Sequence, residues 1–438
     1  MAIKISRILH AGYLFETEHT QILIDPIFEN PFSRNCYAYP AVEFNIEQIK
    51  MLKPAAVFIS HHHDDHCSFD SLKLLNRDTP IYMFCMHAEM FSLLRELGFK
   101  NVFSLKLNQS IKLADLEVIT RKALDSDVDS LFQIKSQGLN ILNVVDSWID
   151  EETLSLLLNE PGWDLILWPF QTMREVEVLS PHRYKAEPQV LPEEWLSQLT
   201  KLNPKNLIPS SCQFRMEDWS WYNQAFFPIS YAQFNKEITT VLPETNIIRL
   251  NPGRTISLNG DEIAEGESLN WIKPIGEQDV DYHYNPTIVA QTTSEIAKHF
   301  QALGDHEDIT VRNYCEKRLL DKFTSLGPAE DSYFIKTRTW QLSLFDHTGF
   351  AKNYYYQLKE ENITLLTEIP ALIDWITEVS EKKLHAALEL GESLTSMYIR
   401  IVCKNEEVDI LQDPLIRCLF SEGFAEYQKA QLKKILNT

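Results

Sequence analysis

The chain has 438 residues, and its 41 Lys and Arg against 62 Asp and Glu give a formal net charge of −21. This length suffices for two or three domains that each bury a core. A surface so acidic disfavours non-specific contact with phosphate backbones or anionic lipid, so we expect no nucleic-acid partner and no membrane partner. With only 13 glycines and neither a GxGxxG nor a GxxxxGK motif, the sequence also disfavours a glycine-rich phosphate loop.

Strand-like and helical patterns alternate from the N-terminus to about residue 245. This alternation is typical of a layered α/β domain. The predicted strands are 4–6, 12–16, 21–25, 55–59, 80–84, 116–120, 130–135, 140–145, 164–168, 206–208 and 251–258, and the predicted helices are 45–53, 88–97, 151–158 and 192–202.

A polar stretch without periodicity, with Gly and Pro, occupies residues 275–286. We therefore predict a metal-binding catalytic domain at 1–275, a linker at 276–290 and a smaller α+β domain at 291–438, which covers the substrate or mediates dimerisation. In the C-terminal part the pattern predicts helices over 292–323 and 381–394 and strands at 332–344, 351–358, 362–367 and 397–402.

The seven cysteines are scattered and form no CxxC pair, as is typical of reduced thiols and not of a disulfide framework. The first residues lack the apolar segment of a signal peptide, and no run of about 18 apolar residues follows. The sequence thus predicts a soluble cytoplasmic protein.

Residues 60–66 read SHHHDDH and hold four of the 13 histidines directly after an apolar strand. A loop at a strand end can aim His61 and His63 at one point, and Asp65 and His66 at a neighbouring point. Two metal ions held in this way share a solvent molecule, and this donor set suits zinc, iron or manganese. The alternative is a polar turn without a metal, but a histidine tag would lie at a terminus.

This motif, with Leu23-Ile24-Asp25-Pro26 upstream, resembles the metallo-β-lactamase superfamily, in particular its ascorbate-lactonase-like branch. The resemblance implies an αββα sandwich with a dinuclear metal site at the sheet edges, over residues 1–255. It also implies that Asp25 orients the ligand loop and that Asp146, after the strand 140–145, bridges the two ions. An N-cap role before helix 151–158 is the alternative for Asp146.

A moderate resemblance links the segments 59–68, 80–82, 141–146 and 252–255 to the metallo-β-lactamase-fold part of CMP-N-acetylneuraminate hydroxylase, an iron-dependent oxygenase family. The Rieske domain of that family is missing here, so neither its electron source nor its nucleotide-sugar substrate carries over. Residues 330–410 weakly resemble a sterol-carrier-protein-like domain.

The superfamily pattern implies two further histidines that this sequence lacks. After the strand 116–120 the chain reads RKALDSDVD, and after 206–208 it reads PSSCQFRMED. We predict that Asp125 replaces the first histidine and Asp218 the second, with Glu217 and Cys212 as alternative donors at the second position. A solvated acidic loop is the alternative for each.

Other residues are candidates for contact with the substrate. His87 follows the strand 80–84, where it would reach the site as a catalytic or substrate-binding group. His182, Arg183 and Lys185 form a basic patch that would neutralise an anionic substrate, or else a plain surface loop. Trp219 would stack on the substrate or pack in the core.

Carboxylates in place of imidazoles make the ligand set harder, which favours iron or manganese over zinc. The sequence therefore narrowly favours a non-haem diiron, O2-dependent oxygenase or hydroxylase that acts on a small molecule, binds two divalent metal ions and takes electrons from an external donor. The alternative is a zinc- or manganese-dependent hydrolase in which a metal-bound hydroxide attacks a phosphoester, lactone or amide. A third alternative is a scaffold with a degenerate site. A homodimer is the oligomeric state we consider.

Overall fold

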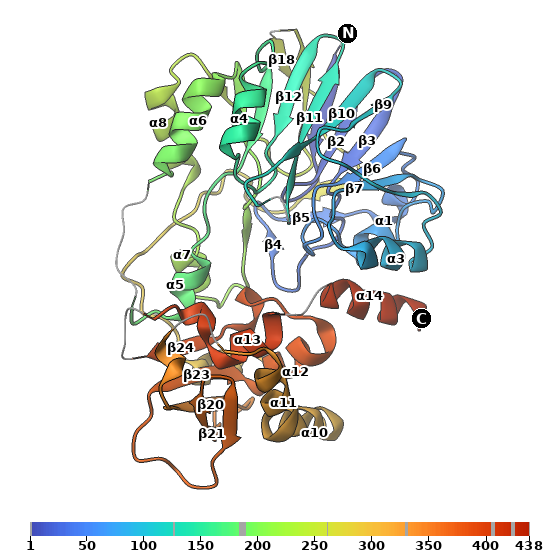
Figure 1. Cartoon of the computed structure of the whole chain (residues 1–438). Helices are drawn as coiled ribbons and strands as arrows, with labels where there is room; N and C mark the ends of the chain where they lie inside the picture. The colour runs from blue at the N-terminus through green and yellow to red at the C-terminus, as the bar shows by residue number, and fades with distance from the viewer. Residues whose placement is uncertain are drawn as a thin grey trace.

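The computed structural model describes residues 2–125, 128–183, 190–260, 262–328, 332–403, 408–421 and 425–437. Its N-terminal part is a sandwich of two sheets that lie face to face (Figure 1). The first sheet has the order β18-β17-β1-β2-β3-β6-β7-β8. Its strands are β1 (Ile3–Arg7), β2 (Tyr13–Glu16), β3 (Gln21–Ile24), β6 (Ala56–Ile59), β7 (Ile81–Met83), β8 (Val102–Ser104), β17 (Thr255–Asn259) and β18 (Glu262–Glu265).

The second sheet has the order β16-β14-β13-β12-β11-β10-β9. Its strands are β9 (Ser110–Leu113), β10 (Leu116–Lys122), β11 (Ser130–Ser136), β12 (Leu139–Asn143), β13 (Leu165–Trp168), β14 (Asn206–Pro209) and β16 (Asn246–Ile247). Both sheets are mixed, with β3, β6, β7 and β8 parallel in the first and β12, β13, β14 and β16 parallel in the second. Every residue of β6 and of β12 is buried, as expected for parallel strands covered on both faces.

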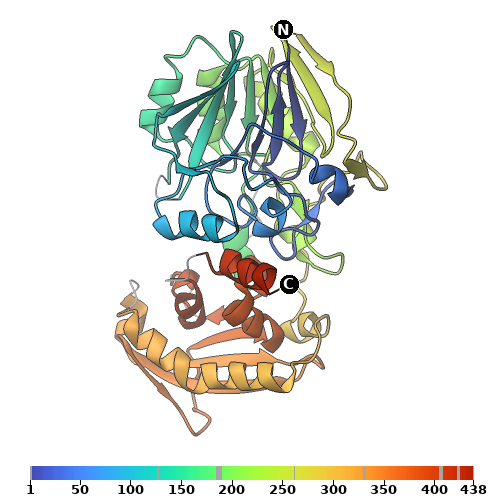
Figure 2. The same ribbon diagram turned by 90° about the vertical axis from the view of Figure 1, so that its right-hand side faces the viewer.

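Helices cover the outer faces of the sandwich, so the predicted α/β metallo-β-lactamase-type architecture is confirmed (Figures 1 and 2). Trp195 on one of these helices packs edge-on against Trp168 of β13, with ring centroids 6.0 Å apart. These helices are α1 (Ile46–Ile49), α2 (Phe69–Leu72), α3 (Ala88–Glu96), α4 (Glu151–Leu157), α6 (Glu193–Leu202) and α8 (Tyr231–Val241). Between the sheets lies an apolar core that includes Phe15, Phe58, Phe132 and Leu167.

The C-terminal domain is smaller and of α+β type, and it has an apolar core of its own around Trp340 and Trp375. Its sheet has the order β22-β21-β20-β23-β24. The strands are β20 (Arg338–Phe345), β21 (Ala351–Lys359), β22 (Asn362–Leu365), β23 (Trp375–Ser380) and β24 (Arg400–Cys403). The helices are α9 (Thr293–Ala297), α10 (Asp305–Asn313), α11 (Leu319–Ser325), α12 (Glu381–Leu390) and α13 (Pro414–Phe420).

Two predicted elements of this domain are corrected. The helix expected over 292–323 is divided, because α9 ends at Ala297, and a π-helical turn at Tyr314–Arg318 joins α10 to α11. The strand expected from residue 332 begins only at Arg338, after a 3₁₀ turn at Ser332–Ile335.

The predicted linker packs against the sandwich. Tyr282 is 7% exposed, and its hydroxyl donates to the carbonyl of Phe214 at 2.9 Å. Tyr39 in turn donates its hydroxyl to the carbonyl of Asp281 at 2.6 Å. This part of the chain is therefore held along the surface of the N-terminal domain.

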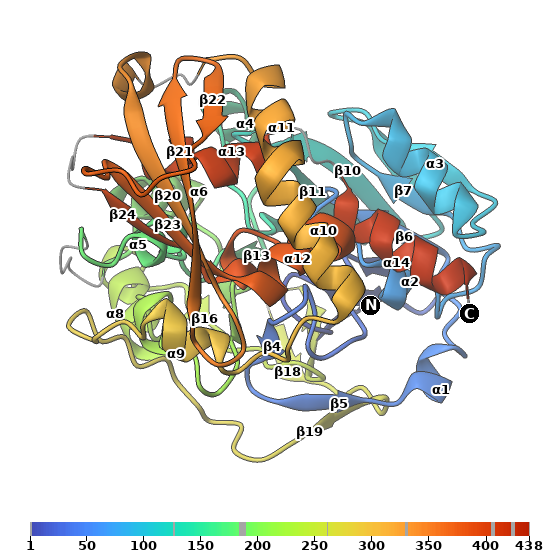
Figure 3. The same ribbon diagram turned by 90° about the horizontal axis from the view of Figure 1, so that it is seen from below.

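The last helix, α14 (Glu426–Leu436), returns to the N-terminal domain and lies against α2 and α3. Figures 1 and 2 show it between the two domains, and Figure 3 shows it beside α2. In the part of the chain that the structure describes, no helix combines the length and apolar character needed to cross a membrane.

Candidate metal centre

Parallel pairing of β3 and β6 brings Asp25 to residues 60–66, which we call the motif loop, because both strands end at the same edge of the sheet. The Asp25 carboxylate accepts the Ser60 backbone N–H at 2.7 Å and the Ser60 hydroxyl at 2.6 Å. Its Oδ2 also lies 3.0 Å from Nδ1 of His66. Asp25 is fully buried, so it ties the start of the loop to its last histidine.

These contacts determine which ring nitrogens face the site. The Ser60 hydroxyl donates to Asp25, so it accepts from Nδ1 of His61 at 2.9 Å, and Nδ1 of His66 donates to Asp25. In the neutral form of each ring, the lone pair of Nε2 is therefore available for a ligand, the usual arrangement of metal-binding imidazoles. Burial and the neighbouring histidines lower the pKa of His61 well below its usual value, so this ring is neutral.

The first group of candidate ligands consists of His61, His63 and Asp129, whose ligand atoms lie within 4.8 Å of one another. His61 Nε2 lies 3.1 Å from His63 Nδ1 and 3.6 Å from Asp129 Oδ1. Asp129 directly precedes β11, and the next residue, Ser130, donates its hydroxyl to the Ser60 carbonyl at 2.8 Å. That bond anchors the start of β11 to the motif loop.

The second group consists of His10, Asp65, His66 and Asp146. Asp146 lies just beyond the end of β12, after Val145 in a left-handed conformation (φ 62°), and its Oδ2 lies 2.9 Å from His66 Nε2. His10 Nε2 lies 3.2 Å from Asp65 Oδ2. The rings of His61 and His66 are 4.0 Å apart between centroids, so the two groups are neighbours.

His10 serves this centre as a hydrogen-bond donor. Its Nδ1 accepts the backbone N–H of Cys212 at 3.3 Å, so the neutral ring carries its proton on Nε2, which faces Asp65. Burial alone would lower the pKa of His10, but hydrogen bonds to Asp146 and Asp65 raise it above its usual value. His10 is fully buried, and it positions Asp65 whether the ring is neutral or charged.

The carboxylates of both groups have oxygens that fit the binding of cations. Asp129 Oδ1 and Asp146 Oδ1 are buried and have no hydrogen-bond partner among the described residues. A buried oxygen without a partner is costly, and bound divalent ions would satisfy these oxygens. Burial would raise the pKa of Asp146, but His66 and His61 hold this pKa well below the usual range. Burial and the charge of Asp146 raise the pKa of Asp129 to about 6. The donor set therefore fits two divalent metal ions.

The centre is closed on the sheet side and reaches solvent through its carboxylates. His61 and His66 are at most 1% exposed, whereas the side chains of Asp65, Asp129 and Asp146 are 22%, 18% and 18% exposed. Beside His63 lies a cavity of about 310 Å³ between the motif loop and the C-terminal domain. Its walls include Asp64 from the loop and Ser393, Leu394, Phe420 and Tyr427 from the C-terminal domain.

The structure corrects two of the predicted ligands. Asp125 is exposed and belongs to neither group, and Asp129, four residues later, is brought to His61 and His63 instead. The side chain of Asp218 is 82% exposed and pairs with Arg215 at 2.8 Å, outside both groups.

Neither alternative donor reaches the ligand groups. Glu217 accepts the Tyr398 hydroxyl at 2.5 Å. Burial raises the pKa of the Cys212 thiol well above its usual value, so this thiol stays protonated. In place of a histidine after β14, the chain thus presents the Cys212 backbone N–H to His10.

The other predicted site residues lie outside the ligand groups. His87 is exposed at the start of α3, and its ring lies 5.5 Å from that of His62. His182 contacts the carbonyl of Cys403 at 3.2 Å, and Arg183 donates to the carbonyl of Val408 at 3.0 Å, so both face the C-terminal domain. Trp219 stacks on His299 with ring centroids 4.1 Å apart. Lys185 lies outside the described residues.

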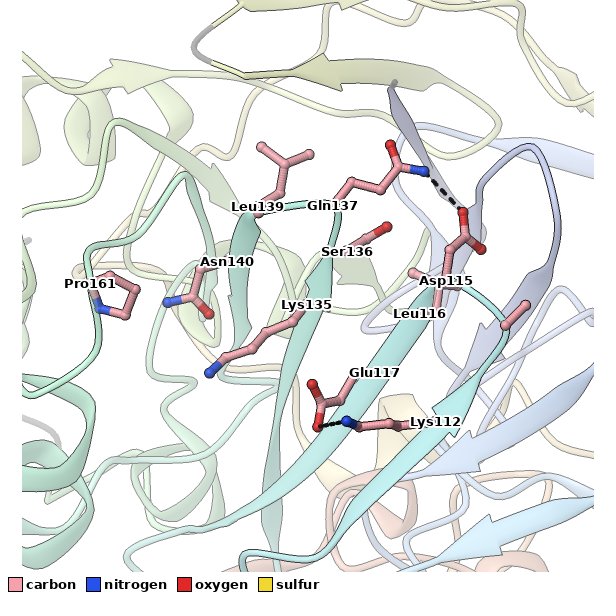
Figure 4. A pocket seen from close by; sticks show the side chains of 12 residues that line it. Lys112, Asp115, Leu116, Glu117, Lys135, Ser136, Gln137, Leu139, Asn140 and Pro161 are labelled. Atoms are coloured by element: carbon pink, nitrogen blue, oxygen red, sulfur yellow. Dashed lines mark hydrogen bonds and ion pairs between the residues drawn. The ribbon is translucent and has the colours of Figure 1, made fainter.

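A second pocket lies at the opposite ends of the strands that carry the centre (Figure 4). It has a volume of about 390 Å³ and is lined by the start of β10 and the end of β11. In it Lys112 pairs with Glu117 at 3.9 Å, and Gln137 donates to Asp115 at 3.0 Å. It contains none of the candidate ligands.

Sequence reasoning did not identify His10 or Asp129.

Replacement of His10 by alanine should weaken binding of the metal beside Asp65 by about 10- to 100-fold, the usual cost of losing an outer partner of a ligand. His10→Gln, which keeps a donor near the position of Nε2, should recover most of the affinity. Metal titrations of the three proteins test this, and His19→Ala, an exposed histidine, is the control. Loss of one ion from both His10 variants at saturating metal would instead make His10 a ligand.

Comparison with known proteins gives one family match and several similar solved structures. Residues 4–147 match the model of the β-lactamase superfamily domain. No curated protein matches the chain. The chain is similar to the solved structure of Igni18, a metallo hydrolase from Ignicoccus hospitalis, with 18% identity and a TM-score of 0.42 over 59% of this chain and 99% of that one. An isothiocyanate hydrolase from Delia radicum gut bacteria has 15% identity and a TM-score of 0.44 over 58% of this chain and 99% of that one. CmlA, a diiron β-hydroxylase from Streptomyces venezuelae, has 15% identity and a TM-score of 0.41 over 59% of this chain and 54% of that one. The match to the β-lactamase superfamily domain spans every candidate ligand among the described residues, from His10 to Asp146.

Proposed function

We propose that the chain is a non-haem diiron oxygenase that hydroxylates a small molecule. The observation that carries this proposal is the first ligand group, in which two imidazoles, His61 and His63, meet one carboxylate, Asp129. Two histidines and one carboxylate form the ligand set typical of non-haem Fe(II) oxygenases.

The second group supports the same metal. Asp65, His66 and Asp146 supply two carboxylates and one imidazole, which is a hard, anionic set that favours iron or manganese over zinc. Bound iron would supply the redox chemistry that activation of O2 requires. The residues of the chain hold the ligands in place, with Asp25 fixing His66 and, through Ser60, His61.

The cavity of about 310 Å³ beside His63 is of a size suited to a small molecule. Its outer wall comes from the C-terminal domain, so we assign this domain the task of covering the substrate and excluding bulk water. Hydroxylation by O2 inserts one oxygen atom into a C–H bond and reduces the other to water. This consumes two electrons and two protons, and we assign the electrons to an external donor.

The second candidate function is metal-dependent hydrolysis of a phosphoester, lactone or amide. The observation that favours it is Asp65, whose carboxylate is 22% exposed while His10 holds its Oδ2 at 3.2 Å. A carboxylate positioned in this way can accept the proton of an attacking water.

Metal content and O2 uptake, measured on protein purified without added metal, distinguish the two functions. We expect about two iron ions per chain, and O2 uptake with a chemical reductant that Asp65→Ala abolishes. Stoichiometric zinc without O2 uptake would overturn the oxygenase. Turnover of a generic phosphodiester or lactone by that zinc protein, lost in Asp65→Ala, would establish the hydrolase.

A further inference from the structure

The helix α14 contacts both ends of the ligand segment of the motif loop. The Gln428 side chain is 2% exposed, and its Nε2 donates to the carbonyl of His62 at 2.8 Å and to that of Cys67 at 3.1 Å. These two carbonyls flank residues 63–66, which contribute three of the candidate ligands. One amide group thus bridges the backbone on either side of the ligands.

A second glutamine of α14 holds the chain just after the loop. Gln431 accepts the backbone N–H of Phe69 at 2.8 Å and donates to the hydroxyl of Ser68 at 3.1 Å. Ser68 is the N-cap of α2, so Gln431 satisfies a backbone group at the start of that helix. The loop therefore ends on a helix whose start is fixed by α14.

Arg34 adds a third connection. Its guanidinium contacts the Asp64 carboxylate in the loop and the carbonyl of Gly391 at the end of α12, and it stacks over the ring of Tyr427 at 4.1 Å. Gly391 has a φ of 68°, and a Cβ there would lie 2.4 Å from the backbone nitrogen of Tyr427. Only glycine allows α12 and α14 to approach so closely at this point.

The polar character of this docking is unusual for a helix that packs on a domain. The buried residues of α14 are Gln428, Gln431 and Leu432. Burial of two amide side chains is costly unless each finds partners, and here the partners belong to the loop and to the helix that follows it. The contact is therefore specific for one conformation of the loop, whereas an apolar contact would tolerate several.

We propose that α14 supports the metal centre and that Gln428 is a positioning residue that holds the motif loop in its metal-binding conformation. The inference rests on the metal site proposed above and goes beyond it in linking that site to the C-terminal helix. Because coupling between two events is reciprocal, metal binding must also stabilise the docking of α14.

The first test is a titration of the metal-free protein with Co²⁺. Binding is monitored through the d–d absorption bands, which report ligand geometry. Gln428→Leu keeps the bulk of the side chain and removes the donor, and we expect it to lower Co²⁺ affinity by about 10-fold or more and to change the band pattern. Lys433→Ala, an exposed position on the same helix, should titrate like the wild type. A wild-type affinity and spectrum for Gln428→Leu would overturn the inference.

The second test uses the unaltered protein, so it holds even if Gln428→Leu does not fold. Hydrogen exchange is compared with and without saturating Co²⁺, and we expect metal to slow exchange of the amides of α14 and of residues 60–68. The edge strand β18 should not change. Unchanged exchange in α14 would overturn the coupling.

The outcomes also distinguish this inference from the proposed function. A wild-type protein that binds no Co²⁺ would overturn the metal centre and the inference together. Coupling of metal to α14 without any O2 uptake would overturn the oxygenase and leave the role of Gln428 intact.

Discussion

Replacement of Asp146 by alanine is expected to abolish activity and to reduce the bound metal from about two ions per chain to one or fewer. Asp146 Oδ2 lies 2.9 Å from His66 Nε2, and its Oδ1 is buried without a hydrogen-bond partner among the described residues. Its charge acts on His66 and His61, one from each ligand group. We therefore expect one carboxylate to serve both ions.

The size of the effect follows from what a bound metal contributes. Several kcal/mol of transition-state stabilisation correspond to a rate loss on the order of 10²- to 10³-fold or more. Metal content by mass spectrometry and turnover of the reconstituted protein measure both effects. Asp218→Ala removes an exposed carboxylate of equal charge and should leave both unchanged. Full metal content and activity in Asp146→Ala would rule out the bridging role.

The part of the centre that the sequence predicts well is local. His61, His63, Asp65 and His66 lie within one short loop after one strand, so their spacing alone brings them together. Asp25 and Asp146 each follow a strand end in the sandwich, and the superfamily resemblance places such residues at one edge. Parallel pairing of β3 with β6 is the physical reason for Asp25.

The residues that sequence reasoning missed depend on contacts between distant segments. His10 follows β1, and only the folded sandwich brings it to the backbone of Cys212, 202 residues later. Asp129 and Asp125 lie in the same acidic loop, and the Ser130–Ser60 hydrogen bond that decides between them cannot be inferred from spacing. The same holds for Gln428, which lies 361 residues from Cys67 on a helix where two of the three buried residues are glutamines.

Asp129 gives the second large effect. Asp129→Ala removes the carboxylate that the first ligand group has among the described residues, so we expect loss of the ion held by His61 and His63 and loss of O2 uptake. Asp129→His restores a third ligand but makes the group all imidazole, a set typical of zinc sites. That variant should bind two ions again, with zinc preferred over iron, and should not regain O2 uptake.

The pH dependence of metal binding provides an independent readout for Asp129. Burial and the charge of Asp146 raise the pKa of Asp129 to about 6 in the metal-free protein, so its carboxyl group is protonated below that pH. Metal ligands must be deprotonated, so affinity for the first ion should fall as the pH decreases through about 6, and this step should disappear in Asp129→Asn, whose amide oxygen does not titrate. Asp125→Ala, an exposed carboxylate of the same loop, should keep the wild-type profile. If Asp125→Ala loses the ion and Asp129→Ala keeps it, the original assignment of Asp125 is right, and the two-histidine, one-carboxylate group must be rebuilt around that residue.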